Sequence, residues 1–385
     1  IDTAAFKNVT SAGNMFSGCT SLNSIDKFGM LSSVCTSYSS MLSGCASLSK
    51  ITFTSDSEYT AWYAKLIATN GASLTLSQLA CNDSVSPTLK LSYYSPITTT
   101  WSNLSSILSS LTTNASITIS DPENVVLANS GTSGSLGYII KSYTGSYLLD
   151  FSCSDFSTAQ YTSGATSLFS SCTKLSGMCK LPASITNASS MFQNCSKLAS
   201  IDTSAFTNVT NVDSMFLGCT SLASIDTTAF TNVTNASSMF YGCSKLASIG
   251  TAAFKNVTDA SYMFSGCTSL ASIDTAAFTK VTDASSMFSD CTSLASIDTS
   301  AFKNVINASN MFYGCTSLAS ITGTAAFTNV TSASAMFLGC TKLASIDTAA
   351  FTKVTIASQM FISCTKLASI DTSAFTNVTN VDSMF

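Results

Sequence analysis

The side chains most able to do chemistry in this 385-residue chain are the thiols of its 15 cysteines. Most of them share one phase of a repeat, and from Cys195 onward they follow one another at steps of 24 or 25 residues. This phase contains Cys19, Cys45, Cys172, Cys195, Cys219, Cys243, Cys267, Cys291, Cys315, Cys340 and Cys364. Thiols bind zinc together with other cysteines or histidines. The sequence has no histidine and no CxxC pair, so we expect no metal and no cofactor.

We call the residues at one position of successive repeats a column. In a stacked repeat the cysteines of one column lie within disulfide range, and an oxidising compartment would permit bonding. A continuous series of disulfides is impossible because each sulfur pairs once, and a buried thiol is also an ordinary core residue. We therefore predict core thiols for this column. The off-phase residues Cys35, Cys81, Cys153 and Cys179 are better candidates for a bridge.

Aspartates form a second column, seven residues after the cysteines: Asp202, Asp226, Asp274, Asp298, Asp347 and Asp371. Stacked carboxylates repel one another, which suggests a bound Ca²⁺. The alternative is that each carboxylate accepts backbone N–H bonds of its own turn, as Asx motifs do. Ca²⁺ needs six to eight oxygens, and no glycine-containing calcium loop accompanies these residues. The local Asx motif is therefore the preferred interpretation.

Asn-x-Ser/Thr sequons recur in fixed phases, which predicts N-glycosylation in a eukaryotic host. The TNVT or KNVT phase contains Asn8, Asn208, Asn232, Asn256, Asn329 and Asn377. The NAS phase contains Asn187, Asn235 and Asn307, and further sequons lie at Asn82, Asn103 and Asn114. Chance and repeat inheritance both produce sequons in a chain rich in Ser and Thr, but this loop is expected to point outward. Asn194 should escape glycosylation because it lies beside Cys195, whose phase is expected to be buried. Lys280 and Lys353 replace asparagine and interrupt the column.

A column of threonines resembles the flat faces of ice-binding solenoids: Thr220, Thr268, Thr292 and Thr316. Threonine is also an ordinary residue of strands, where cross-strand threonine pairs are stabilising. The ordinary interpretation is preferred.

Composition excludes several classes of function. Hydrophobic residues make up 45% of the chain and charged residues 9%, with a net charge of −4. A basic footprint for nucleic acid is therefore absent. No apolar run reaches the length that spans a membrane. The absence of histidine removes the commonest general base. Since the sequence begins and ends in mid-repeat, we expect a window cut from a longer repetitive chain.

The repeat itself, exemplified by residues 225–248, is typical of a solenoid, in which stacked turns supply the core. We predict a short parallel strand at Ser221–Thr227 and a returning helical or 3₁₀ turn at Ala236–Gly242, with strands about 4.8 Å apart and right-handed winding. The apolar positions of one turn are those of Leu222, Ile225, Phe230, Val233, Met239, Phe240 and Cys243. We expect Leu222 and Ile225 to be buried, and Ser224 and Asp226 to be exposed. The fold class is thus an α/β repeat solenoid.

Three segments are predicted: repeat turns at 1–50, an irregular helix and strand segment at 51–147, and the regular solenoid at 148–385. The middle segment is expected to contain helices at Glu58–Thr69 and Thr100–Leu111. Its predicted strands are 74–77, 89–92 and 117–120; a loop at Gly131–Gly137 and a strand at 147–152 follow. Two longer turns of the same solenoid are the preferred interpretation, and an inserted α/β domain is the alternative.

The unit MFSGCTSLASIDTAAF at residues 263–278 resembles the BspA-like leucine-rich repeats of surface proteins, in the MF-x-x-C-x-x-L variant. The resemblance covers 1–50 and about 148–385. It implies an extracellular repeat protein used for adhesion, recognition or surface structure, and it implies no enzyme activity. Any function of the middle segment is not covered.

From these observations we expect a non-catalytic extracellular protein that self-associates into a glycosylated surface fibre or matrix. The alternative is a monomeric adhesin whose strand face binds a ligand through Ala223, Ser224, Asp226 and their copies. An ice-binding solenoid is the third possibility. An enzyme within 51–147 is not supported, because no nucleophile lies in a constellation with a base.

Overall fold

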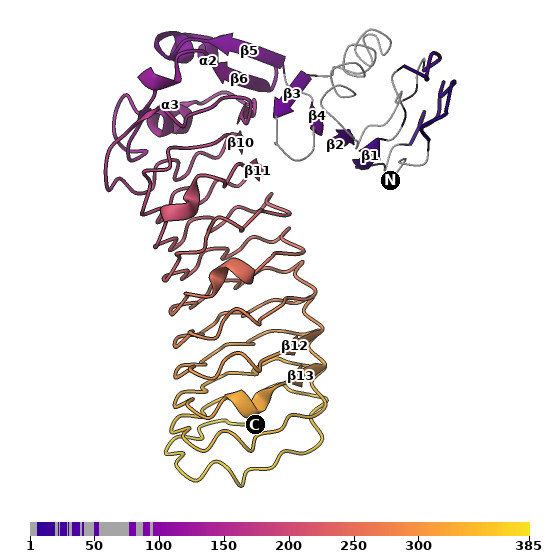
Figure 1. The fold of residues 1–385 in the computed structure, drawn as a ribbon. Helices are drawn as coiled ribbons and strands as arrows, with labels where there is room; N and C mark the ends of the chain where they lie inside the picture. The colour runs from indigo at the N-terminus through magenta and orange to yellow at the C-terminus, as the bar shows by residue number, and fades with distance from the viewer. Residues whose placement is uncertain are drawn as a thin grey trace. The chain divides into compact units, whose positions relative to one another are not determined.

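The computed structural model describes residues 6–19, 22, 24–28, 30, 33–38, 41, 50–53, 77–81, 88–92 and 95–385. The chain divides into two compact units. Residues 1–120 with 147–154 form the N-terminal unit, and residues 121–146 with 155–385 form the repeat unit. Figure 1 shows the chain coloured from the N-terminus to the C-terminus.

The first sheet of the N-terminal unit has the strand order β1-β2-β4-β3. Strands β1 (Ser24–Phe28) and β2 (Lys50–Phe53) are parallel, as expected for successive solenoid turns. Strand β4 (Thr88–Ser92) contains the predicted strand 89–92, but it pairs antiparallel with β2 and with β3 (Ser77–Cys81). The prediction that this part forms a further solenoid turn is therefore wrong. The predicted helix Glu58–Thr69 lies outside the described residues, as does the predicted strand 74–77 except for its last residue.

The following part of the N-terminal unit confirms the sequence prediction of helix and strand. Strands β5 (Ser95–Thr99), β6 (Ala115–Ile119) and β8 (Leu149–Phe151) are parallel neighbours. Between β5 and β6 lie a 3₁₀ turn, η2 (Trp101–Asn103), and helix α2 (Leu104–Ser109), within the predicted helix 100–111. Leu104 and Leu108 are buried one helical turn apart.

The repeat unit begins with η3 (Pro122–Asn124), β7 (Val126–Leu127) and helix α3 (Leu136–Ser142), and β7 pairs with β9 (Gln160–Tyr161). Helix α3 was not predicted. The loop expected at Gly131–Gly137 ends where Ser135 caps this helix by accepting a hydrogen bond from the Tyr138 N–H at 3.1 Å. The buried residues Leu136 and Ile140 show the helical spacing that could have revealed it.

The regular turns stack on one another along the unit (Figure 1), with parallel bridges such as Asn211↔Asn235 and Asn235↔Asp259. Regular strands form in only some turns: β10 (Leu175–Met178) pairs with β11 (Ser200–Ile201), and β12 (Ser296–Asp298) with β13 (Ser320–Thr322). The predicted strand Ser221–Thr227 is not a regular strand. The 3₁₀ turns lie after this position, at η4 (Phe206–Asn208), η5 (Ala252–Phe254) and η6 (Thr324–Ala326).

The prediction of a helical or 3₁₀ turn at Ala236–Gly242 is wrong, and the hydrogen bonds give the reason. The N–H groups of Met239 and Tyr241 bond within the turn, to residues three positions earlier, whereas those of Ser238, Phe240 and Gly242 bond to carbonyls of the next turn at 2.7–2.9 Å. A helix would satisfy its N–H groups internally and would be too wide for stacking at strand spacing. Ser238 and Gly242 instead adopt left-handed backbone, with φ of 54° and 70°.

The core of the repeat unit is built from uniform columns. Leu222, Phe230, Val233, Met239, Phe240 and Cys243 are all fully buried, as predicted. Phe240 stacks on Phe216 and on Phe264 with ring centroids 5.7 Å apart in both pairs. The prediction for Ile225 is wrong: it is only half-buried, although its copies Ile25 and Ile297 are buried. Ser224 and Asp226 are exposed as expected.

Replacement of Phe240 by Ala should lower the free energy of unfolding by about 3–5 kcal/mol, because it removes a fully buried ring from the middle of a stack. Urea denaturation would measure the change. Tyr241→Ala is the matched control, since the adjacent Tyr241 side chain is 42% exposed, and it should cost less than about 1 kcal/mol. A cost for Phe240→Ala as small as that of the control would contradict this account of the core.

Candidate functional site

From Cys172 to Cys364 the thiol column is buried, and each of these thiols donates to a backbone carbonyl. Cys19 of the same column is exposed, so the prediction of a core thiol is wrong there, and Cys45 lies outside the described residues. Cys243 Sγ donates to the Phe216 carbonyl at 3.2 Å, and the same contact recurs with the preceding turn at Cys219, Cys267, Cys291, Cys315, Cys340 and Cys364. Burial raises the pKa of Cys243 to about 12 and that of Cys364 to about 11. The pKa of Cys267 is raised well above its usual value by burial and by the neighbouring Cys243 thiol. The prediction of core thiols is confirmed for these residues.

Off-phase cysteines do not enter this column. Cys35 Sγ donates to the Ser37 carbonyl at 3.7 Å, and Cys179 Sγ donates to the Lys180 carbonyl at 3.6 Å. Cys153 is half-buried, and the side chain of Cys81, in β3, lies outside the described residues. A bridge among these four cysteines therefore stays a prediction.

The aspartate column confirms the Asx interpretation. Asp226 Oδ1 accepts the N–H of Thr228 at 2.9 Å, two residues further on. The same bond, at 2.8–3.0 Å, is made by Asp202, Asp274, Asp298, Asp347 and Asp371. At Asp371 this hydrogen bonding lowers the carboxyl pKa. Within the described ranges, no group of three acidic, cysteine or histidine side chains is placed to hold a metal ion.

A buried threonine column next to the aspartates was missed by the sequence analysis. Thr203, Thr227, Thr251, Thr275, Thr299, Thr324 and Thr348 are at most 5% exposed. The hydroxyl of Thr299, for example, donates to the Thr322 carbonyl at 2.7 Å, and Thr251 donates to Asp274 in the same way. The periodic threonine after each aspartate was the available signal, but a hydroxyl at this position also fits an exposed strand residue.

The asparagine column of the TNVT phase bonds to the preceding turn. Asn232 Nδ2 donates to the Thr207 carbonyl at 2.8 Å, and Asn208, Asn256, Asn304, Asn329 and Asn377 make the equivalent bond. Asn8, Asn208, Asn232 and Asn377 are exposed, whereas Asn256 and Asn329 are half-buried.

The other sequons lie in different surroundings. Asn187, Asn235 and Asn307 are half-buried, and their side-chain oxygens accept N–H bonds of their own turns. Asn103 is exposed, Asn114 is half-buried, and Asn82 lies outside the described residues. Asn194 is exposed at a left-handed position with φ of 59°, so burial beside Cys195 gives no reason to spare it.

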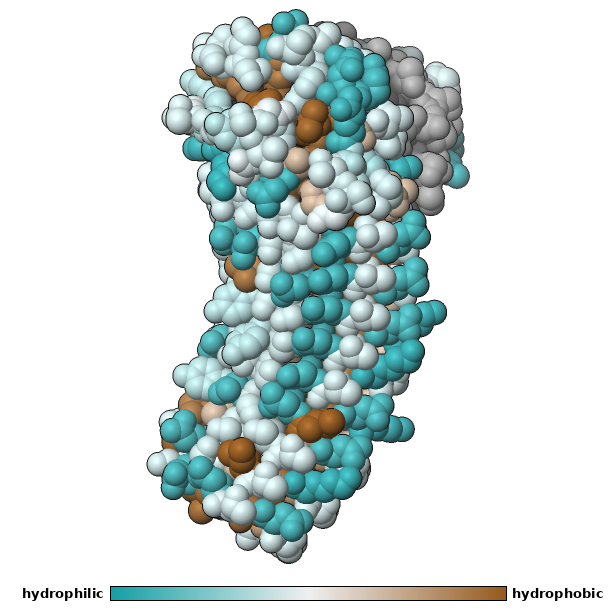
Figure 2. Space-filling view, turned by 90° about the vertical axis from the view of Figure 1, so that its left-hand side faces the viewer, coloured by the Kyte–Doolittle hydropathy of each residue, from teal (hydrophilic) through white to brown (hydrophobic). Residues whose placement is uncertain are grey.

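The surface of the repeat unit is polar but carries little charge. Figure 2 shows hydrophilic and intermediate side chains in rows along the stacked turns, with separate apolar spots. The threonines singled out for ice binding, such as Thr220 and Thr268, donate their hydroxyls to Ser196 and Ser244 carbonyls. These hydroxyl protons therefore face the scaffold.

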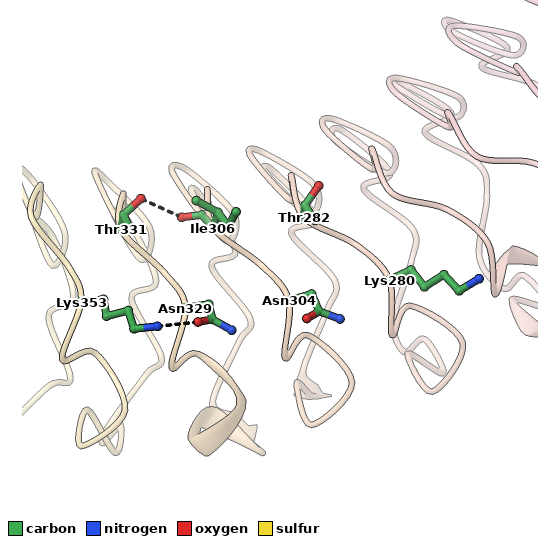
Figure 3. A pocket seen from close by; sticks show the side chains of 7 residues that line it. All are labelled: Lys280, Thr282, Asn304, Ile306, Asn329, Thr331 and Lys353. Carbon is green, nitrogen blue, oxygen red and sulfur yellow. Dashed lines mark hydrogen bonds between the residues drawn. The ribbon is translucent and has the colours of Figure 1, made fainter.

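A groove with a volume of about 540 Å³ lies on this surface. It is lined by Lys280, Thr282, Asn304, Ile306, Asn329, Thr331 and Lys353. Figure 3 shows two parallel rows: the lysines and asparagines form one row, and the threonines with Ile306 form the other. Lys353 Nζ donates to Asn329 Oδ1 at 2.7 Å, and Lys280 Nζ donates to Asn256 Oδ1 at 2.8 Å.

Stacked short turns with leucine, phenylalanine and cysteine columns define a leucine-rich-repeat-like solenoid. A family model described as "BspA type Leucine rich repeat region (6 copies)" matches residues 3–78. The model described as "Mycoplasma protein of unknown function, DUF285" matches residues 163–277 and 282–385, more than half of the chain. The chain belongs to this DUF285 family and is a BspA-like leucine-rich-repeat protein, as the resemblance predicted.

Among solved structures, a leucine rich cell surface protein from Faecalibacterium prausnitzii A2-165 is 16% identical in sequence. The alignment covers 67% of this chain and 82% of that chain, with a TM-score of 0.24. This likeness is too low to decide anything about function. Comparison with curated proteins found no match. No helix in the described part of the chain is both long and apolar enough to cross a bilayer.

The buried thiols should resist alkylation in the folded state, because their raised pKa values keep them protonated and the core excludes the reagent. At pH 9, iodoacetamide should label the exposed Cys19 but not Cys243, as read by mass spectrometry of peptides. Unfolding in urea should make Cys243 reactive. Labelling of native Cys243 as fast as Cys19 would contradict its place in the core.

The same pKa shift gives a direction for stability. The Cys243 pKa rises from 9.0 to about 12 on folding, so the folded state favours the protonated thiol. Its contribution is complete below pH 9 and is lost as pH rises from 9 toward 12.

Proposed function

We propose that this chain is an extracellular, non-catalytic repeat protein that forms the rod-like structural element of a glycosylated surface fibre or matrix. The observation that carries the proposal is that the polar groups of the regular turn bond to the scaffold itself. Thiols, threonine hydroxyls and asparagine amides donate to carbonyls of adjacent turns, as at Cys243, Thr299 and Asn232. Carboxylates such as Asp226 accept N–H bonds of their own turn.

These bonds suit a structural role because they join every turn to the next by both backbone and side chains. In a solenoid, stability is approximately the sum of such nearest-neighbour terms. A nucleophile, by contrast, must be accessible and must be activated by a base. The buried thiols have raised pKa values, and the exposed hydroxyls of Thr220 and Thr268 are hydrogen-bonded to carbonyls. The BspA-like resemblance adds the expectation of a cell-surface location.

Self-association is expected to be visible by electron microscopy. Filaments should be present in concentrated samples and should persist or shorten on dilution, since contacts between copies depend on mass action. Analytical ultracentrifugation of the same samples provides the quantitative control. A monodisperse short rod at every concentration would overturn the fibre proposal.

Such a result would favour the alternative function, a monomeric adhesin. The specific observation that supports this alternative is the exposure of Ala223, Ser224 and Asp226 on the face of the strand position. The Asp226 carboxylate is held in place by the Thr228 N–H, so its position is defined before any ligand binds. Substitutions of the exposed Ala223 and Ser224 side chains would then affect ligand binding with little effect on stability.

N-glycans are the covalent part of the proposal. Nδ2 carries two hydrogens and glycosylation replaces one, so an exposed asparagine can keep its bond to the preceding turn. In a host with N-glycosylation, the exposed Asn208, Asn232 and Asn377 should be occupied, as measured by glycopeptide mass spectrometry. Asn304 is the matched control, because it makes the same Nδ2 bond but lacks a sequon. Unmodified asparagine at all three exposed sequons would refute this part.

A further inference from the structure

The groove on the repeat unit is where the chain departs from its own repeat. The exposed threonine column runs through Thr210, Thr234, Thr258, Thr282, Thr331, Thr355 and Thr379, and only Ile306 replaces threonine in it. In the neighbouring asparagine column, Lys280 and Lys353 replace asparagine. All three departures line the same groove. In a chain of nearly identical turns, such clustering indicates a local role that the other turns do not share.

Ile306 does not improve the scaffold, whereas the two lysines keep a side-chain bond to the preceding turn, at Asn256 and Asn329. The threonines of this column donate to the preceding turn, as Thr282 does to the Thr258 carbonyl at 3.2 Å, and isoleucine cannot make this bond. Ile306 also leaves 50% of its side chain exposed to solvent. An apolar side chain in this position therefore loses a hydrogen bond and gains little burial.

The two lysines provide positive charge without a negative partner. Their ammonium groups bond to the neutral amide oxygens of Asn256 and Asn329. Among the residues that the structure describes, neither lysine makes an ion pair. A neutral partner fixes the direction of each ammonium group but leaves its charge uncompensated, so an anion can still be attracted. Each ammonium lies beside an asparagine, and these two asparagines are three turns apart, or about 14 Å at strand spacing.

Between the two charges the groove offers acceptors and an apolar surface. Asn304 uses Nδ2 for the Thr279 carbonyl at 2.8 Å, so its side-chain oxygen remains on the exposed side as an acceptor. The Thr282 hydroxyl donates to the scaffold and keeps its lone pairs. Ile306 lies in the same row as Thr282 and Thr331 (Figure 3). Bound hydroxyl groups would donate to these acceptors, and an aliphatic C–H face would contact Ile306.

We propose that this groove binds an extended acidic oligosaccharide, with anionic groups at Lys280 and Lys353 and sugar hydroxyls at Asn304 and Thr282. The spacing of the charges requires a chain of several sugars rather than a single ring. The proposal goes beyond the structural role, because it concerns binding by a single unassembled chain.

The sequon pattern is consistent with an accessible groove. Ile306 removes the sequon at Asn304, and the lysines remove those at 280 and 353. The column therefore has no sequon between Asn256 and Asn329. Asn329 is half-buried, and its amide is bonded at both ends, to the Lys303 carbonyl at 2.9 Å and to Lys353. A glycosylated rod would thus carry no glycan of this column between Asn256 and Asn329. The NAS sequon at Asn307, next to Ile306, is half-buried, and its side-chain oxygen accepts the Ser309 N–H at 3.1 Å.

The test is calorimetric titration of the dilute, unglycosylated 385-residue chain with oligogalacturonates of increasing length. Sulfated oligosaccharides test whether carboxylate is required, and neutral malto-oligosaccharides test whether charge is required. The variant Lys280→Gln/Lys353→Gln removes both charges without creating a sequon. The control Lys245→Gln/Lys342→Gln makes the same change in net charge at exposed lysines outside the groove.

The groove variant should bind at least about tenfold more weakly than the parent chain, and the control variant within about twofold of it. Binding should also weaken as ionic strength rises. Ile306→Gln should reduce affinity while leaving the salt dependence unchanged. All variants should have the same melting temperature as the parent chain, since the substituted side chains are exposed.

Three results would overturn the proposal: no binding of any acidic oligosaccharide, equal binding of neutral ones, or equal losses in the groove and control variants. In a further alternative, the aspartate column of a second copy of the chain occupies the groove. Sedimentation of the parent and of the groove variant measures dimer formation and so distinguishes this alternative from sugar binding. Charge-dependent dimerisation without sugar binding would replace the oligosaccharide by that partner. The titration and the sedimentation measurement both use dilute protein, so neither depends on whether concentrated samples form filaments.

Discussion

In the regular turns, alternate backbone N–H groups point along the stack and bond to a carbonyl of the next turn. Phe240 donates to Met263, and Phe216 donates to Met239, both at 2.9 Å. These bonds hold successive turns at strand spacing, about 4.8 Å. That spacing is much smaller than the diameter of a helix. The segment Ala236–Gly242 and its copies therefore form a series of tight turns with residues in left-handed conformation. The uniform side-chain columns of the repeat unit follow from this separation.

Close stacking places each side chain directly over its copy in the next turn. A uniform column is therefore stable only where two identical side chains can pack or hydrogen-bond next to each other without clash or repulsion. Phenylalanine rings do so by stacking with an offset, with ring centroids of successive turns about 5.7 Å apart. Phe254 and Phe278 belong to a second phenylalanine column, and Phe264 contacts Phe278 edge-on. Aspartate would repel its copies, but each carboxylate bonds to the N–H two residues onward and lies at the exposed surface. Threonine and cysteine donate to backbone carbonyls.

The uniform columns form the scaffold. A residue that differs from the others of its column is one whose identity the packing of the scaffold does not require. Ile306 and the two lysines of the groove are such departures. Asp290 and Asn194 are departures of a different kind, because they replace glycine at a left-handed position, with φ of 57° and 59°, and are thereby explained by the backbone. Backbone conformation thus accounts for Asp290 and Asn194 but not for Ile306.

The sequence by itself determined the repeat, its phase and most of the core, because a strict period with apolar residues admits few arrangements other than stacked turns. It also determined the local role of the aspartates, since an Asx motif involves residues only two positions apart. Tertiary structure decided the rest. Burial of Thr227 depends on the Gly250 carbonyl that the next turn presents to its hydroxyl. The helical turn at Ala236–Gly242 was excluded by backbone bonds to the next turn. The antiparallel pairing of β4 and the grouping of Lys280, Ile306 and Lys353 in one groove depend on contacts between residues far apart in sequence, which periodicity does not encode.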